Sequence, residues 1–154
     1  MLQPGSQAPE FELADADGNV LTLGGLLERG PLILYFYPAD FTPGCTKEAC
    51  SIRDIHDDIT GVGLTVVGVS PQDGATHRRF ADKFSLPFPL LCDPNKRAIS
   101  AYDVSGPFGM GTRRATFLIG TDGIIIDAVL ADVRIERHQA FIEKAIAEQR
   151  AAAS

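Results

Sequence analysis

Two cysteines five positions apart, Cys45 and Cys50, are the residues whose types and spacing point most directly to chemistry. An apolar run at 32–37 predicts a buried strand, and Thr42 followed by Pro43 predicts the start of a helix. Cys45 then lies near the third position of that helix. There the positive end of the helix dipole and unpaired backbone N–H groups favour the thiolate over the thiol. The pair therefore predicts redox chemistry.

The spacing of the two cysteines also predicts a conformational change. In an intact helix, residues five apart are separated by about 7.5 Å along the axis and by roughly 140° around it. A disulfide allows a Cα separation of only about 4.4 to 6.8 Å. We therefore expect that a bond between Cys45 and Cys50 unwinds the first turns of the helix, which Gly44 and the polar run 46–48 make less costly.

The elements that position these cysteines alternate between short apolar runs and amphipathic segments, which is typical of one α/β domain. Strands are predicted at Phe11–Leu13, Val20–Leu23, Leu32–Tyr37, Leu64–Ser70, Leu90–Cys92, Ala115–Ile119 and Ile124–Leu130. Helices are predicted at about Pro43–Ile59, Gly74–Phe84, Asp93–Tyr102 and Ile135–Glu148, with a loop at Val104–Thr112 and a frayed tail at Ala151–Ser154. This order predicts a thioredoxin-like fold over residues 1–154, with a central mixed sheet flanked by helices and an N-terminal β-hairpin.

The composition excludes several classes of partner. Acidic residues outnumber basic ones by 20 to 14, the net charge is −6, and no basic stripe could follow a phosphate backbone. Nucleic acid is therefore not an expected partner. No apolar run approaches membrane-spanning length, and the N-terminus lacks the basic and apolar regions of a signal peptide. Three cysteines are too few for a secreted disulfide framework, so we expect a cytoplasmic protein without membrane contact.

The histidines and the third cysteine carry no signal of their own. His56, His77 and His138 lie at polar helical positions, and we expect them to be solvated. A metal site would have to combine Cys45, Cys50, His56 and Cys92, which lack the paired close spacings of zinc and iron–sulfur sites. No metal and no cofactor are therefore predicted, and Cys92 is interpreted as a structural residue.

Three separated motifs carry a family resemblance. The signature Pro-x-x-x-Thr-x-x-Cys is present as Pro38, Thr42 and Cys45, and the longer pattern TPGCTKEAC occupies 42–50. APEFEL at 8–13, PFPLLCDPN at 87–95 and RATFLI at 114–119 extend the similarity over nearly the whole chain. The sequence resembles a peroxiredoxin of the PrxQ or bacterioferritin comigratory protein group.

That resemblance implies a thiol peroxidase that reduces hydrogen peroxide and organic hydroperoxides. It implies that Cys45 is the peroxidatic cysteine, which becomes a sulfenic acid, and that Cys50 resolves this acid as an intramolecular disulfide. It further implies that Arg114 faces the sulfur, that a thioredoxin-type donor recycles the enzyme, and that the protein is a monomer.

Peroxide chemistry needs more than an ionised cysteine, since ionisation alone raises the rate by roughly thirty-fold at most. Donors must be fixed in advance where charge develops on the departing oxygen. Thr42 and Arg114 are the candidates, because the threonine hydroxyl can lean over the sulfur and a guanidinium cannot deprotonate. Strand alternation sends Arg113 to the opposite face, and the RATFLI pattern selects Arg114.

Supporting roles follow from the positions of the neighbouring residues. The backbone N–H groups of Gly44 and Cys45 point toward the sulfur, and Pro38 shields it from water. Glu48, one turn after Cys45, matches the family's acidic residue at that offset and orients Arg114 by a charge-assisted hydrogen bond. Tyr37, together with Phe41, is expected to wall the pocket.

Three alternatives remain open at the level of sequence. Cys50 could simply pack, with an external thiol resolving Cys45. The chain could be a disulfide exchanger, although such proteins normally carry Cys-x-x-Cys. It could also be a non-catalytic redox sensor whose oxidised helix binds a partner protein.

Overall fold

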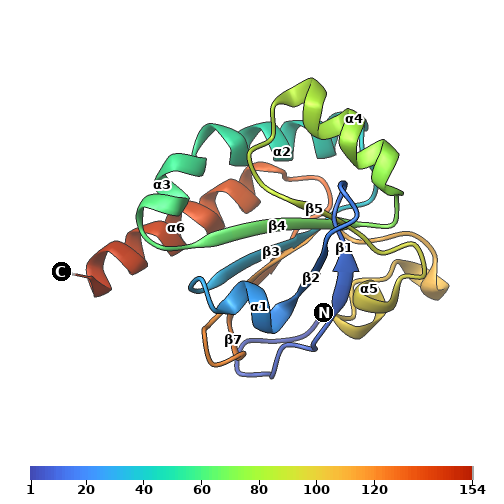
Figure 1. Ribbon diagram of the computed structural model, residues 1–154. Coiled ribbons are helices and arrows are strands. Elements are labelled where there is room, and N and C mark those ends of the chain that lie inside the picture. The colour runs from blue at the N-terminus through green and yellow to red at the C-terminus, as the bar shows by residue number, and fades with distance from the viewer. Residues whose placement is uncertain (154) are drawn as a thin grey trace.

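The central strand β3 (Leu32–Phe36) is buried at every position, as expected of a strand covered on both faces. The computed structural model describes residues 1–153. In it β3 lies in the middle of a five-stranded sheet in the order β5-β4-β3-β6-β7 (Figure 1). Strands β4 (Thr65–Ser70) and β5 (Leu90–Cys92) run parallel to β3. Strand β6 (Ala115–Ile119) pairs antiparallel with β3, and β7 (Ile125–Leu130) pairs antiparallel with β6. The predicted mixed sheet is confirmed.

Side-chain alternation along β3 divides the interior into two cores. Ile33 and Tyr35 face one core, and Leu34 and Phe36 face the other. The first core is covered by α2 (Pro43–Asp54), α3 (His56–Gly61), α4 (Gly74–Phe84) and α6 (Glu136–Ala152) (Figure 1). The second is covered by α1 (Leu23–Leu27), α5 (Arg97–Ala101) and the predicted N-terminal hairpin, β1 (Glu12–Ala14) and β2 (Val20–Thr22).

Several predicted boundaries differ from the structure. The helix predicted to run to Ile59 is broken at Ile55, whose φ of −110° and ψ of 12° separate α2 from α3, although Ile59 is still buried. Helix α1 was not predicted; it begins where Thr22 Oγ1 accepts a hydrogen bond from Gly25 N at 3.0 Å.

The ends of the chain and one loop also differ in detail. The last helix, α6, continues to Ala152, so fraying from residue 151 is wrong, and Ser154 lies outside the described residues. The loop before β6 contains one 3-10 turn, Pro107–Gly109. Among residues 1–153, none of the helices has the length and apolar character needed to cross a membrane.

Candidate active site

Cys45 lies in the first turn of α2, directly after the loop that leaves β3. Thr42 is the N-cap residue with extended backbone, Pro43 occupies the first helical position, and Thr46 N donates to Thr42 O at 2.9 Å. The Cys45 side chain is only 1% exposed and packs in the core that contains Tyr35, Tyr37 and Ala49. The sulfur therefore lies in a largely water-free environment at a helix N-terminus.

A buried arginine bridges this sulfur to a carboxylate. Arg114, the residue before β6, places Nη1 3.4 Å from Cys45 Sγ and 2.7 Å from Glu48 Oε1. Arg114 is 5% exposed and Glu48 is 0% exposed. One guanidinium nitrogen thus donates toward both groups, and Glu48, one turn beyond Cys45, fixes its direction.

Burial and the neighbouring charges shift the pKa values of Glu48 and Arg114. Burial raises the pKa of Glu48 to about 7, and this effect outweighs the attraction of Arg114, which acts in the opposite direction. Burial alone would lower the pKa of Arg114, but the negative charges of Glu48 and Cys45 raise it above its usual value. The arginine therefore stays charged, whereas Glu48 exchanges its proton near neutral pH.

A loop carboxylate separates the two neighbouring arginines. Asp132 Oδ1 accepts from Arg114 N at 3.0 Å, and its carbonyl oxygen accepts from Arg114 Nε at 3.4 Å. Arg113 instead pairs with Asp132 Oδ2 at 2.7 Å near the surface. Only Arg114 is brought to the sulfur, as the strand alternation indicates.

His138 is a buried neighbour of Glu48 that sequence reasoning missed. It is 0% exposed rather than solvated, and its Nδ1 lies 2.8 Å from Thr116 Oγ1 and 3.6 Å from Glu48 Oε2. Its Nε2 lies 2.9 Å from Ala131 O, which can only accept, so this nitrogen carries the proton. Burial lowers the pKa of His138, which favours the neutral ring.

His138 occupies a helical position that permits burial without requiring it. It lies four residues before Ile142 and thus on the apolar face of α6, which a histidine with satisfied ring nitrogens can share. Glu48 Oε2 has no hydrogen-bond partner within residues 1–153, so the cluster is incompletely satisfied at that oxygen.

The other two histidines, His77 and His56, are also at least partly buried. His77 is 0% exposed and lies 2.6 Å from Asp40 Oδ2, so its predicted solvation is wrong. It lies three residues before the buried Phe80, on the inner face of α4. His56 is partly buried, with its ring 6.1 Å from that of Phe88.

Three further predicted site residues, Thr42, Tyr37 and Gly44, lie around Cys45 without a hydrogen bond to its sulfur among the described residues. The Thr42 hydroxyl donates to Ala39 O at 2.8 Å, and no hydrogen bond joins it to Cys45 in the described structure. Tyr37 is buried beside the cysteine, with its hydroxyl 2.6 Å from Asp40 Oδ1. A Cβ added at Gly44 would lie 3.0 Å from Arg114 Nη2, so glycine leaves room for the guanidinium.

The loop residues and the second cysteine complete the surroundings of Cys45. Pro38 is half-buried at the start of the loop, and its carbonyl accepts from Gln72 at 3.2 Å. Phe41 is 43% exposed and packs its ring against Phe80 of α4. Cys50 is a half-buried free thiol on α2.

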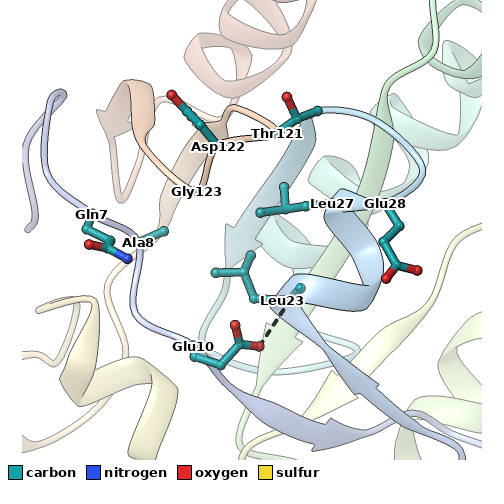
Figure 2. A pocket seen from close by; sticks show the side chains of 10 residues that line it. Gln7, Ala8, Glu10, Leu23, Leu27, Glu28, Thr121, Asp122 and Gly123 are labelled. Atoms are coloured by element: carbon teal, nitrogen blue, oxygen red, sulfur yellow. Dashed lines mark hydrogen bonds between the residues drawn. The ribbon is translucent and has the colours of Figure 1, made fainter.

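A surface pocket lies away from this site. Figure 2 shows it between α1, the segment at 7–10 and the turn joining β6 to β7, with Leu23 and Leu27 pointing toward it. It has a volume of about 380 Å³ and is bordered by Glu10, Glu28 and Asp122. The turn follows Ile119, whereas Arg114 precedes the opposite end of β6. Within residues 1–153, no group of three or more His, Cys, Asp or Glu side chains is arranged to hold a metal ion.

Comparisons with known proteins show the family to which the chain belongs. A profile of the AhpC/TSA family matches residues 4–128. A putative peroxiredoxin of Mycobacterium tuberculosis is 44% identical over 133 residues, which cover 82% of this chain and 84% of that protein. The putative peroxiredoxin bcp of Coxiella burnetii is 39% identical over 145 residues, which cover 90% and 95% of the two chains.

Solved structures show the same similarity in three dimensions. Peroxidoxin BcpB from Mycobacterium tuberculosis superposes with a TM-score of 0.88 at 34% identity, covering 98% of each chain. Peroxiredoxin Q of Xanthomonas campestris gives 0.83 at 28% identity, covering 100% of this chain and 98% of the other. The predicted thioredoxin-like fold is thereby confirmed, and the chain belongs to the AhpC/TSA family, within the PrxQ and bacterioferritin comigratory protein group of peroxiredoxins.

Proposed function

We propose that the chain is a thiol peroxidase in which Cys45 reduces hydrogen peroxide and organic hydroperoxides. The observation that carries this proposal is the single nitrogen, Arg114 Nη1, lying 3.4 Å from Cys45 Sγ and 2.7 Å from Glu48 Oε1 in a buried site. A structural cysteine has no need of a buried cation held by its own carboxylate. Such a pairing stabilises a thiolate and directs a donor at whatever the thiolate attacks.

In the first step, the Cys45 thiolate attacks the terminal oxygen of the hydroperoxide. The S–O bond forms as the O–O bond breaks, and the electron pair moves to the departing oxygen, which leaves as water or an alcohol after taking a proton. Arg114 stabilises the charge on that oxygen, because its guanidinium is fixed before the reaction begins. The Thr42 hydroxyl, now bonded to Ala39 O, gives a second polar group when it rotates toward the peroxide.

In the second step, the Cys50 sulfur attacks the sulfenic sulfur of Cys45. The S–S bond forms, and the hydroxyl leaves as water with the proton of the Cys50 thiol. Both cysteines are free thiols on one helix, so this step requires the first turns of α2 to unwind. A thioredoxin-type dithiol then reduces the disulfide by thiol exchange.

The relatives support the choice of substrates. The bacterioferritin comigratory protein of Xanthomonas campestris, which superposes with a TM-score of 0.82 at 27% identity, has alkyl peroxide reduction activity. By analogy we assign both hydrogen peroxide and alkyl hydroperoxides to this chain. We further propose that it acts as a cytoplasmic monomer formed by one domain.

Mass spectrometry after one equivalent of peroxide tests both steps. The wild type should lose two hydrogens as the disulfide forms, Cys50→Ser should gain one oxygen, and Cys45→Ser should not change. Cys92→Ser is the matched control and should behave as the wild type, because burial raises the pKa of that thiol and keeps it protonated. An unmodified wild type would refute the peroxidase proposal. A mixed disulfide with added thiol in place of the internal bond would refute only the role of Cys50.

A further inference from the structure

A buried hydrogen bond joins the loop before Cys45 to α4. His77 Nδ1 lies 2.6 Å from Asp40 Oδ2, and neither side chain is exposed. His77 Nε2 lies 3.1 Å from Leu91 O, which can only accept, so this nitrogen carries a proton and one further proton lies between Nδ1 and Oδ2. Asp40 Oδ1 accepts from the Tyr37 hydroxyl at 2.6 Å. Every polar atom of the pair is therefore satisfied.

The backbone of the same loop is held by the segment that follows β4. Asp40 N donates to Gln72 Oε1 at 3.1 Å, and Gln72 Nε2 donates to Pro38 O at 3.2 Å. Ser70 orients the amide by donating to Gln72 Oε1 at 2.5 Å. These contacts fix the loop from two sides.

The next residue, Phe41, is held in an uncommon conformation. Its φ is 66°, in the left-handed region that bulky residues rarely adopt. Its ring packs against Phe80 and Phe84 of α4, with centroids 5.2 Å and 6.4 Å away. Helix α4 thus holds Asp40 by a hydrogen bond and Phe41 by ring contacts. A strained residue at such a junction persists only because its surroundings hold it there.

The loop ends at the helix that the reaction must unwind. Phe41 is followed by Thr42, whose carbonyl accepts the first hydrogen bond of α2 from Thr46 N. Contacts that hold the loop favour the folded first turn, in which Arg114 reaches Cys45 Sγ. Loss of those contacts favours the unwound turn, in which Cys50 can reach Cys45.

We propose that His77, acting through Asp40, is a positioning residue that keeps the loop and the first turn of α2 in the peroxide-reactive form. This inference rests on the proposed function. Attack on peroxide needs the folded first turn of α2, and disulfide formation needs the unwound one. His77 shifts the equilibrium between these two forms toward the folded turn. Within residues 1–153, the ring nitrogens of His77 bond to Asp40 and Leu91 O and not to Cys45 or Cys50.

Amide hydrogen exchange of the reduced protein tests, without any peroxide, whether His77 holds the loop before α2. The amides of Asp40 and Thr46 report the loop and the first helical bond. In His77→Gln both amides should exchange at least about ten-fold faster than in the wild type, because local opening no longer breaks the hydrogen bond between His77 Nδ1 and Asp40 Oδ2. Asp40→Asn should keep wild-type exchange, since an amide can donate to Nδ1 and accept from Tyr37. His56→Gln, on α3, is the matched control.

Stopped-flow kinetics then tests the consequence for catalysis. The second-order constant for peroxide should fall by about ten- to a hundred-fold in His77→Gln, because small misplacements of reacting groups are costly. The first-order constant for disulfide formation should not fall. A purely structural role would lower the thermal midpoint while leaving both constants unchanged.

The outcomes separate the two proposals. Wild-type exchange at Asp40 and Thr46 in His77→Gln, or a peroxide constant equal to that of the wild type, overturns the inference. A wild-type protein that does not react with peroxide overturns the proposed function instead. The exchange measurement still decides whether His77 holds the loop.

Discussion

Arg114 Nη1 lies within reach of Cys45 Sγ and Glu48 Oε1 at the same time, and a second contact holds Arg114 Nε at Asp132 O. A planar guanidinium can make these contacts together, whereas the ammonium of a lysine is a single point charge on a flexible stem. The geometry of the site therefore depends on arginine and not only on a positive charge.

Arg114→Lys should lower the second-order rate constant for hydrogen peroxide by roughly a hundred-fold, comparable to the loss of one preorganised donor. Stopped-flow peroxide consumption measures this constant. The neighbouring Arg113→Lys is the control, and it should stay within about two-fold of the wild type because its ion pair with Asp132 lies near the surface. Equal constants for the two lysine variants would contradict the assignment of Arg114.

Glu48 gives a prediction for stability against pH. The pKa of its carboxyl is raised from 4.5 to about 7 by burial, so the folded state binds this proton more tightly than the unfolded state. The resulting stability is complete below the unfolded pKa and is lost as the pH rises through about 7. The loss is on the order of 3 kcal/mol at most.

Urea denaturation of reduced wild type and Glu48→Gln checks this prediction. The glutamine variant has no proton to lose at this position, so its advantage in unfolding free energy over the wild type should grow between about pH 5 and about pH 8. Comparing the two proteins cancels the titration of His138, which both contain. A constant difference across this range would show that Arg114 offsets the burial of the Glu48 charge fully.

The sequence predicted the positions of the proposed reacting residues better than the burial of the residues around them. The helix start predicted the position of Cys45, whereas Arg114 and Glu48 were selected by the family resemblance, through the RATFLI pattern and the acidic residue one turn after the cysteine. The burial of His77 and His138 depends on partners far along the chain, Asp40 and Thr116. A histidine on an apolar helical face can be buried or exposed to solvent, and the sequence does not reveal the partners that decide between them.

At the scale of elements, the proposed mechanism requires α2 to hold Cys45 in place during attack on peroxide and then to unwind in its first turns. Its first turn holds Cys45 under Arg114, whereas its later residues Ala49 and Ile52 are packed in the core. The predicted strands agree with the structure to within about two residues, because apolar runs have clear ends. The break at Ile55 has no glycine or proline to mark it and could not be predicted.

Oxidation to the disulfide should therefore open α2 unevenly. The amides of Thr46 and Lys47 should lose protection in the peroxide-treated protein, whereas that of Ile142 in α6 should keep it, because only the first turns must unwind to bring the sulfurs together. Amide exchange of reduced and oxidised protein measures this difference. Cys50→Ser treated with peroxide is the control and should retain the reduced pattern. Identical patterns for the reduced and disulfide forms would contradict the unwinding.

At the scale of the whole molecule, the sheet separates the site from half of the core. Cys45, Glu48 and His138 lie on the face covered by α2 and α6, while Phe36, Tyr102 and Phe117 pack on the opposite face. Among the described residues, the two cores share the backbone of β3, β4, β5 and β6 but no buried side chain. The stability and the reactivity of the protein should therefore be separable by substitutions on opposite faces.

Phe117→Ala and Ile52→Ala test this separation as a matched pair. Both side chains are 0% exposed, so each substitution should lower the unfolding free energy by about 2–5 kcal/mol through lost packing and a cavity. Ile52 lies on the helix that carries Cys45, and its loss should also reduce the second-order constant for peroxide. Phe117 lies across the sheet from the sulfur, so its variant should keep the wild-type constant at temperatures well below its unfolding midpoint. A matching loss of reactivity in both variants would mean that the sheet transmits the change, and that the far core also positions Arg114 at the start of β6.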